Sequence, residues 1–388
     1  MTARSTRRRG AALVAAVAAT ALSVVGCTGS GGVGPEPTTT GALTGSLRAS
    51  GSQVQFAAVE PWRVAFVTNH PGVTVNYEPI GSDHGAAQFI AGEVDLAALD
   101  APLTGQQLRD ARERCSSEVI QLPVHIAAVS IVYSAPGVTD LRLSPQTLAA
   151  IFNRQITRWN DPRIAADNPG LTLPKDRLRT VHRLDDAWQS QALSAYLTSV
   201  DPRAWPYPAT LQWPITDGPL QRAAKGTEEL LEVVADGKGR VGYATMDQTT
   251  PASGREVKVA ALRSGARWVA PSAATAAAAL DSAVRIAPKS STNLAVSRPT
   301  PGQSGGSGAA PVYPVVSISY QVACAEQPTA EKAALVREWL TWATSSQAQR
   351  AAAEATGSAP IGEQWRERAT AAIGRIHVAP STTSSSPK

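Results

Sequence analysis

Hydrophobic and polar positions along the chain follow the pattern of short strands that alternate with helices. Apolar and polar residues alternate over residues 73–77, which predicts a half-buried strand, and a short apolar run at residues 94–99 predicts another. Helices are expected over residues 86–91, 104–115 and 329–344, the last with strong helical periodicity. This order predicts an α/β fold with a mixed or mostly parallel sheet that is covered by helices.

The same pattern continues through the middle of the chain. A pair of strands is predicted across residues 122–134, and a later strand at residues 313–323. Ser144 and Pro145 suit the N-cap and the first position of a helix, and Asp201 with Pro202 predicts a similar helix start.

The N-terminus has the features of a bacterial export signal. Four arginines within residues 4–9 precede an apolar run at residues 11–25 that is too short for a stable membrane anchor. The run ends in VVGC at residues 24–27, which resembles the lipobox of bacterial lipoproteins. We therefore expect residues 1–27 to be a signal peptide and Cys27 to carry lipid on the extracytoplasmic face of the cell membrane. An ordinary signal peptide with a chance cysteine is the alternative.

Three segments have compositions that do not predict packed structure. Residues 28–45 are mostly Gly, Ser, Thr and Pro and predict a disordered tether, and residues 377–388 predict a disordered tail. Residues 297–311 predict a flexible surface loop. The roughly 330 residues between the tether and the tail have ordinary apolar content and suffice for two lobes, without a second apolar run of membrane-spanning length.

Charge and cysteine usage exclude several classes of function. The net charge of +5 includes the arginines of the export signal, so the remainder is close to balanced, and no basic stripe with interleaved aromatic residues predicts nucleic-acid binding. With Cys27 lipidated, Cys115 and Cys324 remain, and in an oxidising compartment such a pair is more often a disulfide than two free thiols. The five histidines are scattered and neither cysteine has a ligand-spaced partner, so neither a metal nor a cofactor is expected.

An ordered set of short motifs resembles the phosphate-binding proteins of bacterial ABC importers (PstS-like proteins). These motifs, from the N-terminal to the C-terminal side, are VNYEPIGS at residues 75–82, QFIAGEVD at 88–95, DAPL at 100–103, LP at 122–123, ITRWNDP at 156–162, NPG at 168–170, VGY at 241–243 and WLTW at 339–342. The resemblance covers residues 46–376.

The resemblance implies the periplasmic-binding-protein type II fold, with two α/β lobes, two crossover strands and a ligand cleft between the lobes. The first lobe would consist of residues 46–123 and 251–376, and the second of residues 124–250. Cys115 and Cys324 would then lie in one lobe, which makes their pairing possible. The expected protein is a monomer that delivers phosphate to the permease of an ABC importer.

The resemblance also implies a ligand site. Asp100 matches the aspartate that accepts the proton of hydrogenphosphate, Arg183 matches the arginine that supplies positive charge, and Ser82 matches a hydroxyl donor. Ser52 stands in the first glycine-rich loop. The sequence departs from the family at residues 184–189, where LDDAWQ replaces a segment of serines, glycines and a threonine. Simpler interpretations also exist: Asp100 as a helix N-cap, Arg183 paired with Asp185 or Asp186, and Trp188 as a core residue.

Three functions therefore remain open at this point. The first is a phosphate receptor, which residues 52, 82, 100 and 183 favour. The second is a related binding module for another solute or a protein partner, which the altered segment 184–189 favours. A secreted enzyme is the third and is disfavoured, because the sequence contains no recognisable nucleophile motif, paired carboxylates or metal-ligand set.

Overall fold

The computed structural model describes residues 42–215, 218–236, 239–249, 257–297 and 310–380. The predicted signal peptide, Cys27 and most of the predicted tether lie outside the described residues, and so does residue range 298–309 of the predicted loop. Among the described helices, none combines the length and the apolar composition that crossing a bilayer requires.

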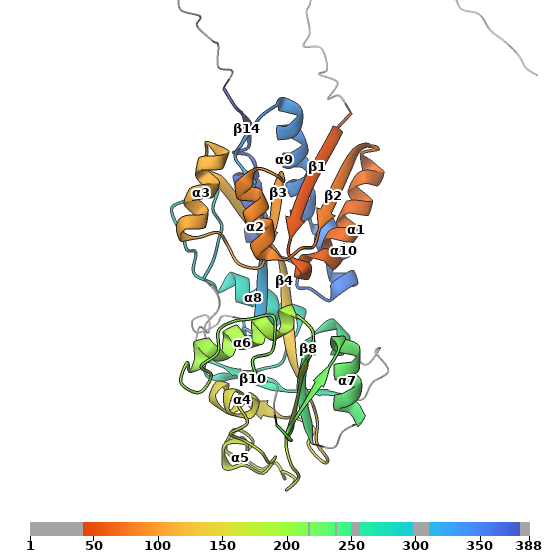
Figure 1. Cartoon of the computed structure of the whole chain (residues 1–388), viewed down its shortest axis with the longest axis vertical. Coiled ribbons are helices and arrows are strands. Elements are labelled where there is room, and N and C mark those ends of the chain that lie inside the picture. The colour runs from red at the N-terminus through yellow and green to blue at the C-terminus, as the bar shows by residue number, and fades with distance from the viewer. Residues whose placement is uncertain (1–41, 216–217, 237–238, 250–256, 298–309, 381–388) are drawn as a thin grey trace, which may run out of the picture. The chain divides into compact units, whose positions relative to one another are not determined.

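A nine-stranded mixed sheet passes through both lobes of the molecule (Figure 1). Its strands follow the order β2-β1-β3-β12-β4-β8-β6-β7, and β9 pairs with β4 beside this path. The strands are β1 (Thr44–Gly51), β2 (Gly72–Glu78), β3 (Leu96–Leu99), β4 (Val119–Ser134), β6 (Arg179–Arg183), β7 (Gln221–Ala224), β8 (Arg240–Thr245), β9 (Lys258–Val259) and β12 (Val316–Cys324). The mixed sheet that the sequence predicted is confirmed.

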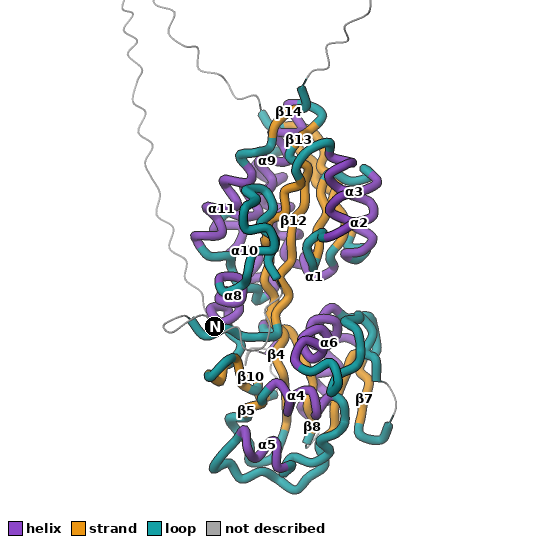
Figure 2. The backbone as a smooth tube through the Cα atoms, turned by 90° about the vertical axis from the view of Figure 1, so that its left-hand side faces the viewer, coloured by secondary structure: helices purple, strands orange, loops and turns teal. Residues whose placement is uncertain are grey.

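Helices cover the sheet of the first lobe on both faces. In Figure 2, α2 and α3 lie on one side of the strands, and α9, α10 and α11 lie on the other. The helices of this lobe are α1 (Gln53–Asn69), α2 (Ser82–Ala91), α3 (Gly105–Cys115), α9 (Ala330–Thr344), α10 (Ser346–Thr356) and α11 (Glu363–Ile373). Helix α9 agrees closely with the helix predicted over residues 329–344. It begins after Thr329, whose hydroxyl oxygen accepts a hydrogen bond from the Lys332 backbone N–H and so caps the helix.

The second lobe has helices α4 (Pro145–Phe152), α5 (Pro162–Asp167), α6 (Trp188–Val200) and α7 (Gly226–Asp236) around its part of the sheet. The predicted cap of α4 is present, since the Ser144 hydroxyl accepts a hydrogen bond from the Thr147 backbone N–H. The core of this lobe is rich in aromatic rings. Trp213 packs at 5.1 to 5.5 Å between ring centroids against Phe152, Trp205 and Tyr243.

Strand β4 connects the two lobes. It is a single strand of 16 residues where the sequence predicted a pair, and all but its last residue are buried. Residues 119–128 pair antiparallel with β12, whereas residues 129–134 pair antiparallel with β8. Because neighbours cover both faces of β4, apolar residues occupy most positions on both faces instead of alternating, and the polar residues Gln121, His125 and Ser130 are buried with them. The second connection follows helix α8 (Ala273–Asp281), which lies beside β4 and β12.

The chain returns to the first lobe later than residue 251, where the sequence analysis placed the boundary. Residues 258–259 pair with the second-lobe end of β4, and β10 (Ala261–Ser264) pairs with β5 (Arg142–Leu143) of the second lobe. Strand β10 also forms a hairpin with β11 (Arg267–Val269) around Gly265. The pairing of this hairpin with β5 was not predicted, because pairing between distant strands depends on tertiary packing.

Three smaller predictions about local structure are wrong. Asp201 and Pro202 do not start a helix. Asp201 instead ends α6, and its carboxylate accepts hydrogen bonds from the backbone of residues 203 and 204. The predicted tether ends before residue 45, because β1 begins at Thr44 and pairs with β2. Within the predicted tail, β14 (His377–Val378) pairs with β13 (Glu326–Gln327), so a partner strand orders residues whose own sequence carries little structural signal.

A disulfide bond joins Cys115 at the end of α3 to Cys324 at the end of β12. The two Cα atoms are 5.3 Å apart and the two residues are 209 positions apart in the sequence. Both cysteines are almost fully buried. The bond therefore closes a very long loop, and both of its ends lie in the first lobe.

Removal of this disulfide should destabilise the protein. The double substitution Cys115→Ser and Cys324→Ser is expected to lower the free energy of unfolding by about 2–5 kcal/mol, because the cross-link restricts the unfolded chain. Urea unfolding measures this difference. A reducing agent should lower the unfolding midpoint of the natural chain and leave that of the double variant unchanged; equal midpoints for the oxidised and reduced natural chain would contradict the prediction.

Candidate functional site: a cleft between two lobes

Three of the four predicted ligand residues meet at the carboxyl ends of the first-lobe strands. Ser52 follows β1, Asp100 follows β3, and Ser82 is the first residue of the helix that follows β2. Because β1 is parallel to both β2 and β3, their carboxyl ends lie at one edge of the sheet. In open α/β sheets this edge is where ligands bind.

The Asp100 carboxylate is the centre of this group. Its Oδ1 accepts hydrogen bonds from the hydroxyls of Ser52 at 2.5 Å and Ser319 at 2.8 Å. Its Oδ2 accepts a third from Ser82 at 2.8 Å, and the Ser82 oxygen accepts one from the Asp100 backbone N–H at 2.9 Å. Asp100 is not a helix N-cap, since α3 begins at Gly105 with Thr104 as its N-cap.

Small residues and a helix cap allow this close arrangement. A Cβ atom on Gly85 of α2 would lie 2.5 Å from the Gly51 Cα atom, so glycine lets α2 pack against the end of β1. Ser52 is the N-cap of α1, and its oxygen accepts a hydrogen bond from the Gln55 backbone N–H at 3.0 Å. The Tyr77 hydroxyl donates to the Ser52 carbonyl, and burial together with the nearby Asp100 charge raises the Tyr77 pKa.

Arg183, the fourth predicted residue, lies in the second lobe at the end of β6. Its guanidinium forms a bidentate ion pair with Asp185, and its Nη1 donates to the Thr227 hydroxyl at 2.9 Å. Asp185 also accepts a hydrogen bond from the Gly226 backbone N–H, at the first residue of α7. The Arg183 hydrogen bonds, with help from Gly226, hold the pKa of Asp185 well below its usual value. Of the two predicted partners, Asp185 is therefore the one that pairs with Arg183.

Asp100 and Arg183 face different cavities in the cleft. Asp100 lines a mainly apolar cavity of about 240 Å³, whereas Arg183 lines a more polar one of about 570 Å³. Val54 of α1 and Trp188 of α6 line both. Trp188 is partly exposed and stands at the first position of α6, so it is more than a core residue. The altered segment 184–189 thus brings a large ring to the boundary between the two cavities.

The polar cavity also contains a buried histidine that the sequence analysis did not select. His125 of β4 is 2% exposed, and its Nδ1 has no hydrogen-bond partner among the described residues. Burial lowers the pKa of His125 to about 4. Thr227 and Ser319 were missed as well. Ser317 and Ser319 alternate with apolar residues in the strand predicted at residues 313–323. This alternation could have indicated that both serines lie on one face of the strand and are available to the site.

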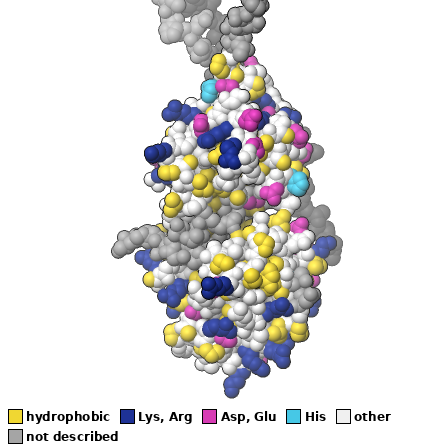
Figure 3. All heavy atoms as spheres, turned by 60° about the vertical axis from the view of Figure 1, so that its left-hand side comes forward, with side chains coloured by type: hydrophobic (Ala, Val, Ile, Leu, Met, Phe, Trp, Pro, Cys, Tyr) yellow, Lys and Arg dark blue, Asp and Glu magenta, His cyan; other side chains and the backbone are white. Residues whose placement is uncertain are grey.

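The surface around the cleft carries no continuous band of positive charge on the face that Figure 3 shows. Hydrophobic side chains gather there where the two lobes meet, while Lys and Arg side chains are scattered over both lobes. Within the described part of the chain, no group of three or more His, Cys, Asp or Glu side chains is arranged to hold a metal ion.

Two α/β lobes, joined through β4 and separated by a cleft at their strand ends, define a two-lobed solute-binding protein. The domain signature of the PBP superfamily matches residues 36–347. The chain is 30% identical to the phosphate-binding protein PstS 2 of Mycobacterium tuberculosis, over 95% of this chain and 99% of that protein. The chain therefore belongs to the PBP superfamily and, within it, to the PstS phosphate-binding protein family.

Solved structures agree with this fold. A high-affinity periplasmic phosphate-binding protein, PfluDING, solved with bound phosphate, superposes with a TM-score of 0.59 at 20% identity, over 83% of this chain and 92% of that one. PstS from Borrelia burgdorferi superposes with a TM-score of 0.54 at 14% identity, over 82% of this chain and 99% of that one. At these identities the comparison establishes the fold, and the predicted two-lobed fold class is confirmed.

Buried histidines should make the protein sensitive to acid. His125 and His182, which are 2% and 1% exposed, both have pKa values lowered by burial, so protonation is easier in the unfolded chain. For His125 the folded state then loses stability as pH falls below about 6.5 toward about 4, by up to about 1.4 kcal/mol per pH unit, and His182 adds a loss in the same direction. Urea unfolding at a series of pH values measures this loss.

Substitution of the two histidines tests the cause. The combination His125→Gln and His182→Phe should reduce the fall in unfolding free energy over this pH range, whereas His84→Gln, at an exposed position, should not. If the double variant kept the full pH dependence of the natural chain, other groups would be responsible for it.

Proposed function

We propose that this protein is an extracytoplasmic receptor that binds inorganic phosphate and delivers it to an ABC importer. The observation that supports this most strongly is the Asp100 carboxylate, which accepts hydrogen bonds from three serine hydroxyls at the edge of the cleft. Relatives of the chain carry the name phosphate-binding protein PstS. The protein acts as a receptor, and its cleft binds the anion without chemical change.

The role of Asp100 follows from the protons of the ligand. Hydrogenphosphate carries one P–OH group, which can donate a hydrogen bond to a carboxylate, while its other oxygens accept. A serine hydroxyl has a single hydrogen, so Ser52, Ser82 and Ser319 turn that hydrogen from Asp100 to the phosphate oxygens as the ligand binds. Fully deprotonated sulfate would leave an acceptor facing the Asp100 acceptor, which costs binding free energy.

Helix N-termini add further donors to the first-lobe half of the site. Helix α1 begins at Gln53 beside Ser52, and α2 begins at Ser82. The first backbone N–H groups of a helix lack partners within that helix, and the helix dipole favours an anion at this end. The half-site therefore combines hydroxyl and amide donors with one carboxylate acceptor that requires a protonated ligand.

Arg183 supplies positive charge from the second lobe. Because Arg183 and Asp100 line separate cavities, a hinge motion that brings the lobes together, with displacement of Trp188, is needed before one phosphate reaches both. The separation of the two cavities and the altered segment 184–189 also favour the second candidate function, a receptor for a solute other than inorganic phosphate.

The phosphate site is tested by Asp100→Asn in the full chain in a nonionic detergent. An amide can donate to a fully deprotonated oxyanion, so the variant should lose phosphate affinity by about 10- to 100-fold and should gain sulfate binding. Isothermal titration with phosphate and with sulfate measures both affinities. Asp140→Asn, at an exposed position of the second lobe, is the matched control and should bind like the natural chain.

Two results would count against this assignment. One is an Asp100→Asn variant with natural affinity and natural preference for phosphate, which would move the site elsewhere. The other is a folded natural chain that shows neither heat nor thermal stabilisation with millimolar phosphate, which would favour a different solute.

The N-terminal sequence supports a lipid anchor at Cys27 that holds the monomeric receptor near its permease. Cys27 follows the apolar run and the sequence VVG, as the processing of bacterial lipoproteins requires. Cys27→Ser in the producing bacterium should therefore abolish incorporation of a labelled palmitate analogue. Equal labelling of the variant and the natural chain would show that the lipid is attached elsewhere or that the label is not specific.

A further inference from the structure

The cavity that Asp100 lines is larger and more apolar than a site for a small hydrophilic anion requires. Its volume of about 240 Å³ is many times the minimum that one water molecule needs. Beyond Asp100, its walls consist mainly of apolar side chains, namely Pro102, Ile286, Val296, Val316, Ile318 and Trp188. The polar end and the apolar walls belong to one continuous space, as is usual for sites that bind organic ligands.

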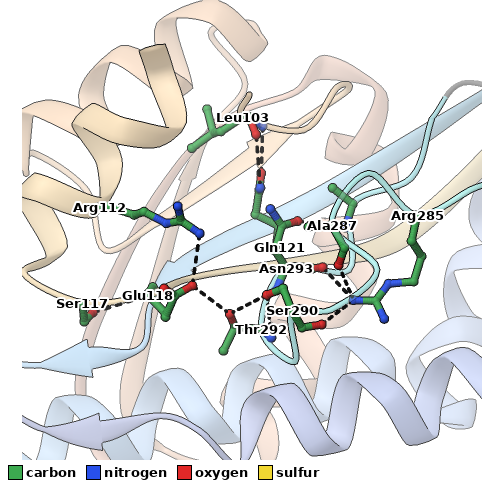
Figure 4. Close-up of polar contacts among 11 residues, drawn as sticks. Leu103, Arg112, Ser117, Glu118, Gln121, Arg285, Ala287, Ser290, Thr292 and Asn293 are labelled. Carbon is green, nitrogen blue, oxygen red and sulfur yellow. Dashed lines mark hydrogen bonds and ion pairs between the residues drawn. The ribbon is translucent and has the colours of Figure 1, made fainter. Parts of the chain in front are cut away.

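Polar contacts hold one wall of this cavity in place, as Figure 4 shows. The Arg285 guanidinium donates to the carbonyl oxygens of Ala287, Ser290 and Asn293, at distances from 2.5 to 3.2 Å. This fixes the turn that follows Ile286. Val296, at the other end of the same segment, accepts a hydrogen bond from the Tyr320 hydroxyl and donates one to it.

The opposite wall is tied to strand β4. The Gln121 side chain of β4 accepts a hydrogen bond from the Leu103 backbone N–H at 2.7 Å and donates to the Leu103 carbonyl at 3.2 Å (Figure 4). Its backbone carbonyl accepts a hydrogen bond from Leu294 at 2.9 Å. Gln121 therefore fixes the loop after Asp100 and the segment before Val296 at once, and both walls are held in place before any ligand binds.

We propose that this cavity binds the organic substituent of a phosphate monoester whose phosphoryl group lies at Asp100. The proposal rests on the function proposed above, because it uses the same phosphate half-site. A monoester monoanion retains one P–OH for Asp100, and its remaining oxygens accept hydrogen bonds from the serine hydroxyls. The ester oxygen carries a compact apolar group along β12, where Val316 and Ile318 line the wall.

Trp188 determines the direction in which the substituent lies. Because Trp188 and Val54 stand between the two cavities, a ligand held at Asp100 in this conformation has apolar walls beside it, while Arg183 lies in the other cavity. Arg183 already has a carboxylate partner in Asp185. The replacement of small residues by the segment 184–189 thus favours a ligand with an apolar group over a bare anion.

The test compares inorganic phosphate with phenyl phosphate by isothermal titration of the full chain in a nonionic detergent. Titrations are made at about pH 5.5, below the second ionisation of a phosphate monoester near pH 6. Ala192 of α6 lines the apolar cavity, so Ala192→Leu fills part of it without touching Asp100. Ser199→Leu, at an exposed position of the same helix, is the control for added apolar volume outside the cavity.

Phenyl phosphate should bind the natural chain at least as tightly as inorganic phosphate. Ala192→Leu should lower the affinity for phenyl phosphate by about tenfold and change the affinity for inorganic phosphate by less than about threefold. Ser199→Leu should leave both affinities unchanged. The proposal would be overturned if the natural chain bound phenyl phosphate with an affinity at least about 100-fold lower than its affinity for phosphate. It would also be overturned if Ala192→Leu lowered the affinities for both ligands equally.

The two proposals fail in distinguishable ways. Binding of phenyl phosphate without binding of inorganic phosphate would refute the phosphate receptor and support the organic-phosphate site. Binding of inorganic phosphate alone would do the reverse. If a folded chain binds neither ligand, both proposals are wrong.

Discussion

The antiparallel pairing of β12 with the first half of β4 is the contact on which both lobes depend. Strand β12 also pairs with β3, and the second half of β4 pairs with β8, so the sheets of the two lobes are continuous through one strand. This pairing places Ser319 of β12 beside Asp100 at the end of β3. Both the crossover between lobes and the polar centre of the cleft therefore depend on the register of a few strands.

Two carboxylates in the cleft already accept hydrogen bonds from other groups of the protein. Asp100 is satisfied by hydroxyl donors, and Asp185 occupies the guanidinium of Arg183 and the first N–H of α7. In each half of the cleft a carboxylate of the protein takes the donors that a ligand would use. On the proposed function, an anion would exchange hydrogen bonds instead of filling vacant ones. Its net affinity would then be small relative to the number of contacts and would depend on whether the ligand carries a proton.

Local pattern was most informative where an element carries its own signals. Helix α9 was predicted because its apolar residues repeat with helical spacing, and α4 because Ser144 and Pro145 mark its start. Helix α6 was not predicted, since Ala187 at its N-cap makes no side-chain cap and the preceding residues suggest a loop. The second-lobe hairpin of β10 and β11 was assigned to the wrong lobe, because its partner β5 is more than a hundred residues away in sequence.

The sequence by itself determined the α/β class, the family, and the three residues Ser52, Ser82 and Asp100 that meet at the strand ends. It did so through the ordered motifs that resemble the PstS family, whereas the parallel pairing that brings these strand ends to one edge was seen only in the structure. Only the tertiary structure decided that Arg183 pairs with Asp185, that Ser319 joins Asp100, and that Trp188 stands between two cavities. Those contacts join residues from different elements, and their geometry depends on packing across the cleft, which no local pattern records.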